Sequence, residues 1–446
     1  MKKLSYLIII AFFISGCSSF LEVDPKTSIS GENVIHDETS AKAALSAVYV
    51  ALRNYYSVSF QSIGYLSGDN IEWTGSQSQI QEFINHKVNP ENSTLEQTWN
   101  GIYNSINRNN NLIKALESSN DLGIEEAEKN NLLGQAYAIR GLNYFDLVRV
   151  WGGVPLIVNP TENVGENSGI ERSSIEETYS QIGNDLNKAE ELLEDTNVDR
   201  FNVGKNTVLA LQARFNLYQK NWAKASEYAQ KVIDDNSYEL LNPFSSFFKN
   251  NVVGTKESVF ELFYSANELN SHRGQWQPQS NGGTRQWAPN SELVSLLNDP
   301  ITGGSRKELI AKDNQGRWYG NLYYRSPAID PTYIIRIAEL YFIRSEANAQ
   351  LGNYELALAD LNKIRNRAQL EAKNSTNSLN EILKWIEEER RLEFALESDR
   401  WFDLVRTGKA QEVLKITESF RLLLPIPYSQ LLADPAIKQN PGYSSN

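Results

Sequence analysis

The sequence predicts a mainly α-helical fold in which helix pairs form a scaffold, with a long loop-rich face and few short strands. Two long stretches, residues 94–117 and 125–150, place apolar residues at the spacing of amphipathic helices. An Asn-aromatic-x-x-Ala pattern occurs twice, each time between two helical stretches. Other long segments lack the helical period but are rich in aromatic residues, which favours ordered loops over disorder.

Helical periodicity is expected over 40–56, 94–117, 125–150, 174–194, 206–219, 222–235, 333–350 and 354–367. Ser-x-x-Glu sequences predict capping boxes at Ser93, Ser173 and Ser378. A short strand is expected within residues 257–264. Three segments without helical period connect these elements: 57–92, 152–172 and 238–332.

The repeated pattern is Asn221-Trp222-x-x-Ala225 in one place and Asn353-Tyr354-x-x-Ala357 in the other. A turn residue, an aromatic wedge and a small residue where two helices cross resemble tetratricopeptide helix pairs. One such pair cannot bury its apolar face alone, so several pairs are expected to stack.

The composition of the chain argues against several classes of function. The 446 residues are 41% hydrophobic and 22% charged, with a net charge of −12. A nucleic-acid partner is not expected, because phosphate contacts need clustered Lys and Arg. The single Cys excludes a disulfide framework, and His36, His86 and His272 lack the spacing of a zinc site. No cofactor and no metal is therefore expected.

The N-terminus has the pattern of a secretory signal. Two lysines follow Met1, and the apolar run over residues 4–14 is shorter than the ~20 residues of a membrane-spanning helix. The sequence Ile14-Ser15-Gly16-Cys17 resembles the bacterial lipobox, which implies cleavage before Cys17 and its acylation with palmitate-type lipid. The alternative is an ordinary signal peptide with an incidental Cys.

These patterns predict one domain behind a leader. The expected organisation is a lipoprotein signal peptide at 1–16 and a single domain at 17–446, comprising a tether at 17–30, helix-pair units around 94–150, 174–235 and 333–367, and a loop-rich insertion at 238–332.

Four stretches resemble one known family. They are AIRGLNYFDLVRVWGGVPL at 138–156, TYIIRIAELYFIRSEANAQLGN at 332–353, DRWFDLVRTGKA at 399–410 and LLLPIPYSQLLADPAIKQNPGY at 422–443. Together with the lipobox, and in this order, they resemble SusD/RagB-like outer-membrane nutrient-binding lipoproteins. The resemblance spans the whole mature chain.

The resemblance implies a non-catalytic protein on the outer membrane, held by an N-terminal lipid and facing the cell exterior. It also implies a SusC-like TonB-dependent transporter as partner, with oligosaccharides or glycans as ligands and peptides as the alternative. The motif residues Arg400, Trp401, Asp403 and Arg406 precede Gly408, which can end a helix, and are expected to fix packing.

Sugars present flat C–H faces and dense hydroxyls, so a sugar site needs aromatic rings beside planar polar groups on loops. The candidates for ligand binding are Asp69, Asn70, Trp73, Trp276 with Arg273 and Gln277, Trp287 with Arg285 and Gln286, and Arg317, Trp318 and Tyr319 followed by Asn321. Asp69 or Asn70 could instead cap a turn, and Trp73 fits a ligand platform and a local core equally. The other Trp residues lie on or at predicted helices and are expected in the core: Trp99, Trp151, Trp222, Trp385 and Trp401.

No catalytic residue is predicted. A glycan-degrading enzyme needs two carboxylates ~5–10 Å apart, which a sequence with 55 Asp and Glu does not exclude. However, the sequence shows no GxSxG, Walker or GxGxxG motif. The acidic and basic run over 387–391 is expected to be a solvated helix face. A pure scaffold explains the helix pairs but leaves the aromatic loops without a role.

Overall fold

The computed structural model describes residues 35–118, 122–163, 165–194 and 199–444. The predicted signal peptide, the lipid-attachment residue Cys17 and the tether at 17–30 lie outside the described residues. Within the described ranges, no helix has the length and apolar character needed to cross a membrane.

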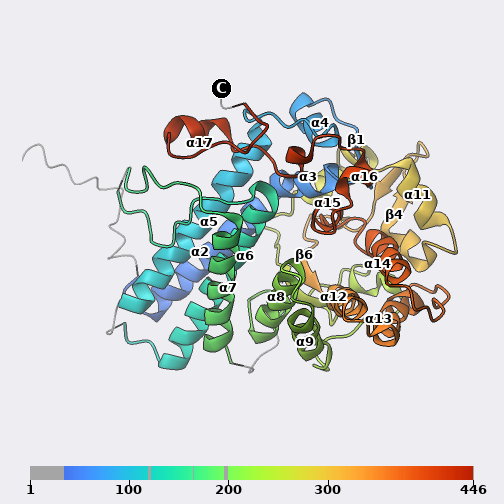
Figure 1. Cartoon of the computed structure of the whole chain (residues 1–446), viewed down its shortest axis with the longest axis horizontal. Helices are drawn as coiled ribbons and strands as arrows, with labels where there is room; N and C mark the ends of the chain where they lie inside the picture. The colour runs from blue at the N-terminus through green and yellow to red at the C-terminus, as the bar shows by residue number, and fades with distance from the viewer. Residues whose placement is uncertain (1–34, 119–121, 164, 195–198, 445–446) are drawn as a thin grey trace, which may run out of the picture.

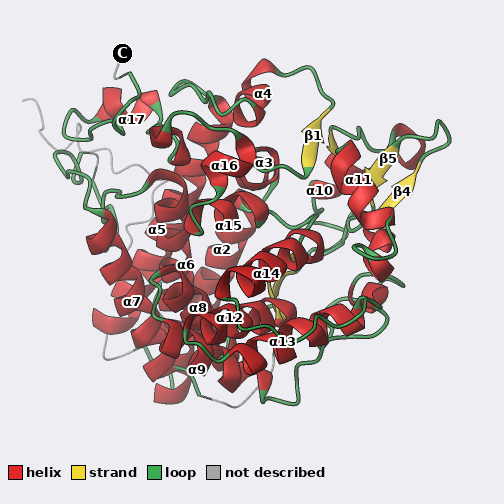
Figure 2. Cartoon of the chain, turned by 45° about the vertical axis from the view of Figure 1, so that its right-hand side comes forward, coloured by secondary structure: helices red, strands yellow, loops and turns green. Residues whose placement is uncertain are grey.

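The described chain is mainly helical, with few short strands (Figure 2), as predicted. The long helices are α2 (Glu38–Tyr55), α5 (Ser93–Ser118), α6 (Glu126–Trp151), α7 (Ile175–Leu192), α8 (Lys205–Tyr218), α9 (Trp222–Ile233), α12 (Ile337–Gln350), α13 (Tyr354–Arg367) and α14 (Leu379–Glu393). The short helices are α3 (Val58–Leu66), α4 (Ser78–Ile84), α10 (His272–Trp276), α11 (Ser291–Asn298), α15 (Arg400–Arg406), α16 (Ala410–Leu414) and α17 (Tyr428–Ala433).

The strands form three two-stranded antiparallel pairs. They are β1 (Ile71–Trp73) with β3 (Trp287–Pro289), β2 (Ser258–Leu262) with β6 (Thr332–Arg336), and β4 (Ile310–Lys312) with β5 (Trp318–Gly320). The predicted strand within 257–264 is therefore confirmed. Residues 333–336 were expected at the start of a helix, but they belong to β6 and pair with β2 instead.

Consecutive long helices pack against one another and form a curved row, which runs from α2, α5, α6 and α7 through α8 and α9 to α12, α13 and α14 (Figure 1). The loop-rich elements β1, β4, β5, α10 and α11 gather on the opposite side of the molecule (Figure 2). The segment 57–92, expected to be non-helical, contains α3 and α4.

Both copies of the Asn-aromatic-x-x-Ala pattern form the same turn. The backbone N–H of Asn221 and that of Asn353 each donate to the carbonyl five residues earlier, at 2.8 Å. The residues before them, Lys220 and Gly352, both have positive φ, and the Ala four residues after each Asn is fully buried. A shared turn that aligns two packed helices supports the tetratricopeptide-like description.

The predicted caps are only partly correct. Ser378 caps α14 by accepting the N–H of Glu381. The cap of α7 is Ser174 rather than Ser173. At α5 the side chain of Asn92 accepts the first backbone N–H groups, so Ser93 is not the cap. Neighbouring Ser and Asn residues offer the same acceptor, and the loop geometry decides between them.

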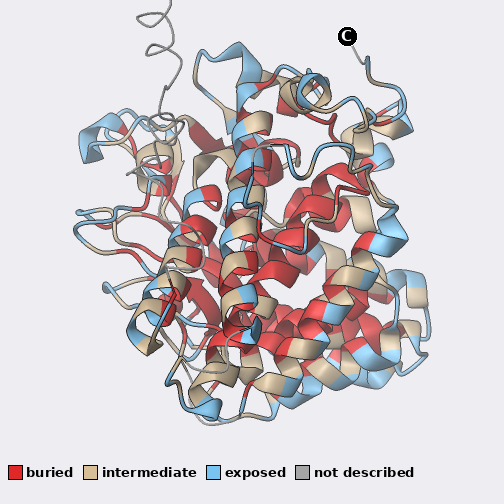
Figure 3. Ribbon diagram, turned by 90° about the vertical axis from the view of Figure 1, so that its left-hand side faces the viewer, coloured by how far each residue is buried: buried red, intermediate tan, exposed pale blue. Residues whose placement is uncertain are grey.

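The inner faces of the helices are buried and the outer faces are exposed (Figure 3). Trp99, Trp151 and Trp401 lie in the main core, as predicted. Trp222 and Trp385 are only partly buried and pack against the edges of hydrophobic clusters.

Candidate functional site

Strand pairing brings two of the predicted aromatic regions to one surface. β1 pairs with β3, so that Trp73 lies opposite Trp287, and β3 in turn lies next to β5, which begins with Trp318. The N–H of Thr74 continues the first pair by donating to the carbonyl of Gln286 at 2.9 Å. Trp73 and Trp318, distant in sequence, are therefore carried by two strands that lie next to the same strand, β3.

The indole of Trp73 is partly exposed and packs at the edge of the core. The ring packs closely against the backbone of Gly75, because a Cβ at position 75 would lie 2.4 Å from a carbon of the indole. Trp73 therefore fits both alternatives, a local core residue and a ligand platform, since one part of the ring packs on the core and another part is accessible.

Trp318 is also partly exposed, at the start of β5. The ammonium group of Lys312, on the paired strand β4, lies 4.7 Å from the centroid of its ring. Beside it, Tyr319 is partly exposed, and Arg317 is exposed and forms an ion pair with Asp313 at 2.8 Å. All three residues of this predicted group therefore remain accessible.

Arg285 connects the two aromatic strands. Its Nε donates to the carbonyl of Trp318 at 2.7 Å, and its guanidinium lies 3.9 Å from the carboxylate of Glu72 next to Trp73. The Glu72 side chain is half exposed. We call Glu72, Trp73, Arg285, Arg317, Trp318 and Tyr319 the aromatic surface.

Trp276 and Trp287 are fully buried, so the prediction that they contact ligand is corrected. Their rings lie 5.5 Å apart at a steep angle, and Tyr65 contacts both. Trp276 also packs so closely on Gly320 of β5 that a Cβ there would lie 2.5 Å from the indole. These two Trp residues form the layer that supports the aromatic surface.

Asp69 and Asn70 also have structural partners. Although burial raises the pKa of Asp69, the guanidinium groups of Arg400 and Arg391 hold it below its ordinary value, at 2.7 and 3.3 Å. Asn70 is buried, and its Oδ1 accepts from Nε of Arg391 at 2.8 Å. These contacts tie the loop before β1 to α14 and α15. The burial of Asn70 corrects the ligand role predicted for it, whereas Asp69 remains partly exposed.

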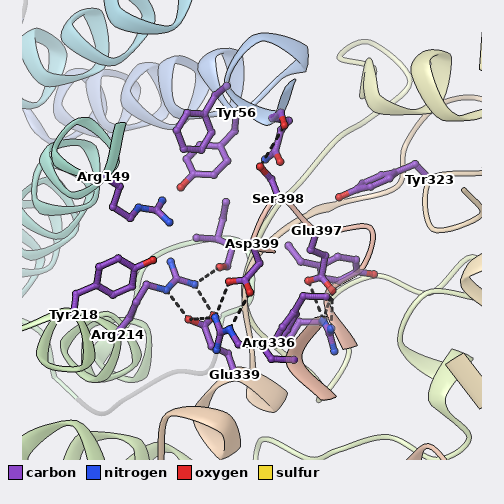
Figure 4. Close-up of a pocket in the computed structure, with 16 residues that line it drawn as sticks. Tyr56, Arg149, Arg214, Tyr218, Tyr323, Arg336, Glu339, Glu397, Ser398 and Asp399 are labelled. Carbon is purple, nitrogen blue, oxygen red and sulfur yellow. Dashed lines mark hydrogen bonds and ion pairs between the residues drawn. The ribbon is translucent and has the colours of Figure 1, made fainter. Parts of the chain in front are cut away.

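A small internal cavity of about 60 Å³ lies between α3, α6, α8 and the segment after α14 (Figure 4). Its charged side chains pair with one another: Arg214 with Glu339 at 2.7 Å, and Arg390 with Asp399 at 2.6 Å. A cavity of this size accommodates water molecules but no sugar chain.

Buried ion pairs of α14 correct the prediction that residues 387–391 form a solvated face. Glu389 and Arg390 are buried, and Glu389 forms an ion pair with the fully buried Arg306 at 2.8 Å. The motif residues after them behave as predicted, because Arg406 pairs with Glu346 and Asp403 inside the molecule. These ion pairs are structural.

Across the described part of the chain, no group of three or more His, Cys, Asp or Glu side chains is arranged to hold a metal ion. The aromatic surface offers two indoles, a phenol, two guanidinium groups and one carboxylate. Such a set stacks on flat faces and exchanges hydrogen bonds with hydroxyls.

His272 lies in the layer below this surface and makes that layer sensitive to acid. It is fully buried, and its ring contacts Trp287 and Tyr323. Burial lowers the pKa of His272 from 6.5 to about 4. Its neutral form therefore contributes stability above pH 6.5, and this contribution is lost as the pH falls through 4.

We expect the unfolding free energy of the wild type to fall by about 2 kcal/mol more than that of His272→Gln between pH 7 and pH 5, because only the wild type must charge this buried ring. Urea denaturation at a series of pH values measures both curves. Carboxylates titrate equally in the two proteins and cancel in the difference. Parallel pH profiles would contradict the buried neutral state.

The fold is a scaffold of helix pairs that carries the aromatic surface, and comparison with known proteins identifies relatives of this chain. A family model described as "Starch-binding associating with outer membrane" matches residues 19–217, and one described as "SusD family" matches residues 324–420. SusD-like protein P38 of Formosa agariphila is 28% identical, with 99% of each chain covered.

Two solved structures have the same fold. A SusD superfamily protein from Bacteroides vulgatus is 20% identical, with a TM-score of 0.82 over 91% of this chain and 99% of that one. A laminarin-binding SusD-like protein is 27% identical, with a TM-score of 0.81 over 91% of this chain and all of that one. The chain belongs to the SusD-like family.

Proposed function

We propose that this protein binds oligosaccharides or glycans at the cell surface, without cleaving them, and delivers them to a SusC-like TonB-dependent outer-membrane transporter. The observation that carries the proposal is the pair of partly exposed indoles, Trp73 and Trp318, on two strands that both lie next to β3, with Arg285 in contact with both strands. Cys17 would hold the protein to the outer membrane through its lipid.

The chemistry of the aromatic surface suits a saccharide. Indole rings stack on the C–H face of a pyranose, and the guanidinium of Arg285 and the carboxylate of Glu72 can donate to and accept from adjacent hydroxyls. The relative that binds laminarin makes this glucan the first ligand to test. A peptide is the alternative ligand, and it becomes the leading one if no saccharide binds.

Replacing Trp73 or Trp318 singly with Ala is expected to weaken laminarin binding by about 1–3 kcal/mol, by analogy with the stacking of bases on aromatic side chains. Affinity electrophoresis in gels containing laminarin or other glycans measures the change. Trp385→Ala is the matched control, because Trp385 is also partly buried and has a Lys ammonium, that of Lys373, at 5.1 Å from its ring.

The expected result is that only the Trp73 and Trp318 variants migrate faster than the wild type. Equal retardation of all three variants would reject this surface as the site. New reducing ends in glycan incubated with purified protein would reject the non-catalytic function. Release of the protein from membranes by Cys17→Ser would support the lipid anchor.

A further inference from the structure

A second concave site lies on the far side of the scaffold from the aromatic surface. It is a groove of about 620 Å³ between the first half of α5, residues from 155–161 and 165–170, and the C-terminal helix α17. Figure 1 shows α17 beside the upper end of α5, and a hydrogen bond of 3.2 Å from Gln430 to Asn100 joins the two helices. Its volume falls in the range of about 300–1,000 Å³ that is usual for ligand sites. It shares no residue with the aromatic surface.

The floor of the groove is apolar and contains a fixed aromatic ring. Tyr103 is partly exposed, and its ring lies 5.0 Å from that of the buried Trp99. The hydroxyl of Tyr103 donates to the carbonyl of Pro155 at 2.8 Å, which holds the ring in place. Ile157, Ile170 and Ile437 extend this apolar floor.

The rim carries amide groups with unused hydrogen-bonding capacity. The Oδ1 atoms of Asn100 and Asn104, one helical turn apart on α5, accept from Gln430 and Arg108, whereas their Nδ2 groups have no acceptor in the described chain. Asn167 donates to Thr161 at 2.6 Å and keeps its Oδ1 as an acceptor. The rim can thus both donate and accept.

The groove carries almost no charge, although 22% of the whole chain is charged. No Lys, Arg or Glu lines it, and its one carboxylate is engaged, since Asp434 accepts from the N–H groups of Gly169 and Ala436 at 2.7 and 2.9 Å. An anionic ligand would enter without a counter-charge, which is unfavourable. A ligand with a flat apolar face and neutral polar edges fits.

We propose that this groove is a second binding site for a neutral sugar unit, which rests its C–H face on Tyr103 and directs its hydroxyls to Asn100, Asn104 and Asn167. The saccharide class rests on the proposed function, but the site is independent of the aromatic surface. Two separated sites would let one polysaccharide chain, or two chains, contact the protein at once, which raises the effective concentration of ligand at each site.

The test uses isothermal titration calorimetry of the full mature chain with laminaritriose, a probe too short to span both sites. The proteins are the wild type, the Trp73→Ala/Trp318→Ala variant and the Asn104→Ala/Asn167→Ala variant. Asn111→Ala is the control, because Asn111 lies on the same helix and does not line the groove. The side chain of Asn104 is exposed and that of Asn167 is only partly buried, so the fold is expected to be retained.

Two sites per protein are expected in the wild type, and one should remain in the Trp73→Ala/Trp318→Ala variant. In the Asn104→Ala/Asn167→Ala variant, the groove should bind the trisaccharide about 2- to 10-fold more weakly for each hydrogen bond lost. Electron density for the trisaccharide against Tyr103 in a soaked crystal would support the same conclusion.

A single site that disappears in the Trp73→Ala/Trp318→Ala variant would overturn the groove and leave the proposed function standing. A single site that responds only to Asn104→Ala/Asn167→Ala would support the groove and reject the aromatic surface. Density for the chain's own residues 17–34 in the groove, or no binding by any of the proteins, would overturn the second site.

Discussion

Replacing Arg336 with Met is expected to lower the free energy of unfolding by about 3–5 kcal/mol, the usual cost of removing one partner of a buried ion pair. Arg336 is fully buried at the end of β6. Its guanidinium lies 2.7 Å from Glu257, 3.0 Å from Glu393 and 2.6 Å from Glu397. Without Arg336, these three carboxylates lose a counter-ion inside the protein, where their negative charge is poorly solvated.

The stability lost in Arg336→Met should depend on pH in a defined direction. Burial raises the pKa of Glu393, but Arg367, Arg306 and Arg336 outweigh this effect and hold it at about 2, below its ordinary 4.5. The ionised form of Glu393 therefore contributes stability above pH 4.5, which is lost as the pH falls through 2. The deficit of Arg336→Met should be largest at neutral pH and smaller in acid.

Urea denaturation of Arg336→Met and the wild type measures the difference. Lys231→Met is the control, since Lys231 pairs with Glu227 at 2.9 Å on the exposed face of α9 and should contribute at most about 1 kcal/mol. A loss for Arg336→Met no larger than that for Lys231→Met would show that the buried ion pairs of Arg336 contribute little to stability.

Helix periodicity predicted most of the scaffold because each long helix has to bury one face along a regular stripe. The prediction was wrong where a short apolar run had two solutions. Residues 332–336, TYIIR, fit a buried strand and the first turn of a helix equally, and only the distant strand β2 decides between them. The predicted helix cap differs from the observed one by a single residue for a similar reason, as at α7, where Ser174 is the cap instead of Ser173.

The candidate site was harder to predict because burial of a side chain depends on partners far away in sequence. Trp276 and Trp318 both occur beside Arg or Gln in loops, but Trp276 is covered by Tyr65 and Gly320. Nothing in the sequence around Asp69 indicates its ion pair with Arg400, which lies far along the chain and 2.7 Å away in the structure. No local pattern distinguishes these cases.

Charge runs have the same ambiguity. The run at 387–391 is three Glu followed by two Arg, which places opposite charges three and four residues apart and fits a solvated helix face. In the structure, Glu389 accepts from Arg306 and Arg365, which come from two other segments. The sequence shows the charges but not the partners that bury them.

Replacing Trp287 with Ala is expected to cost about 3–5 kcal/mol of stability, as for other buried Trp residues, and also to weaken laminarin binding without contacting the ligand. Trp287 is fully buried on β3, opposite Trp73 across the β1–β3 pair and in contact with Trp276, on which Gly320 of β5 packs. The cavity left by the indole would loosen both strands that carry the exposed rings.

Two further variants separate this support role from simple loss of stability. Trp287→Phe refills much of the cavity and should recover most of the binding. Leu361→Ala, in a separate hydrophobic cluster, should lower stability by a comparable 2–5 kcal/mol, roughly, without changing the affinity of the folded protein for laminarin. Equal affinity of folded Trp287→Ala and wild type would mean that Trp73 and Trp318 keep their positions without the buried layer. A selective loss in Trp287→Ala would instead make the burial of this residue part of the binding function, since a ring stacks well on a sugar only when its own position is fixed.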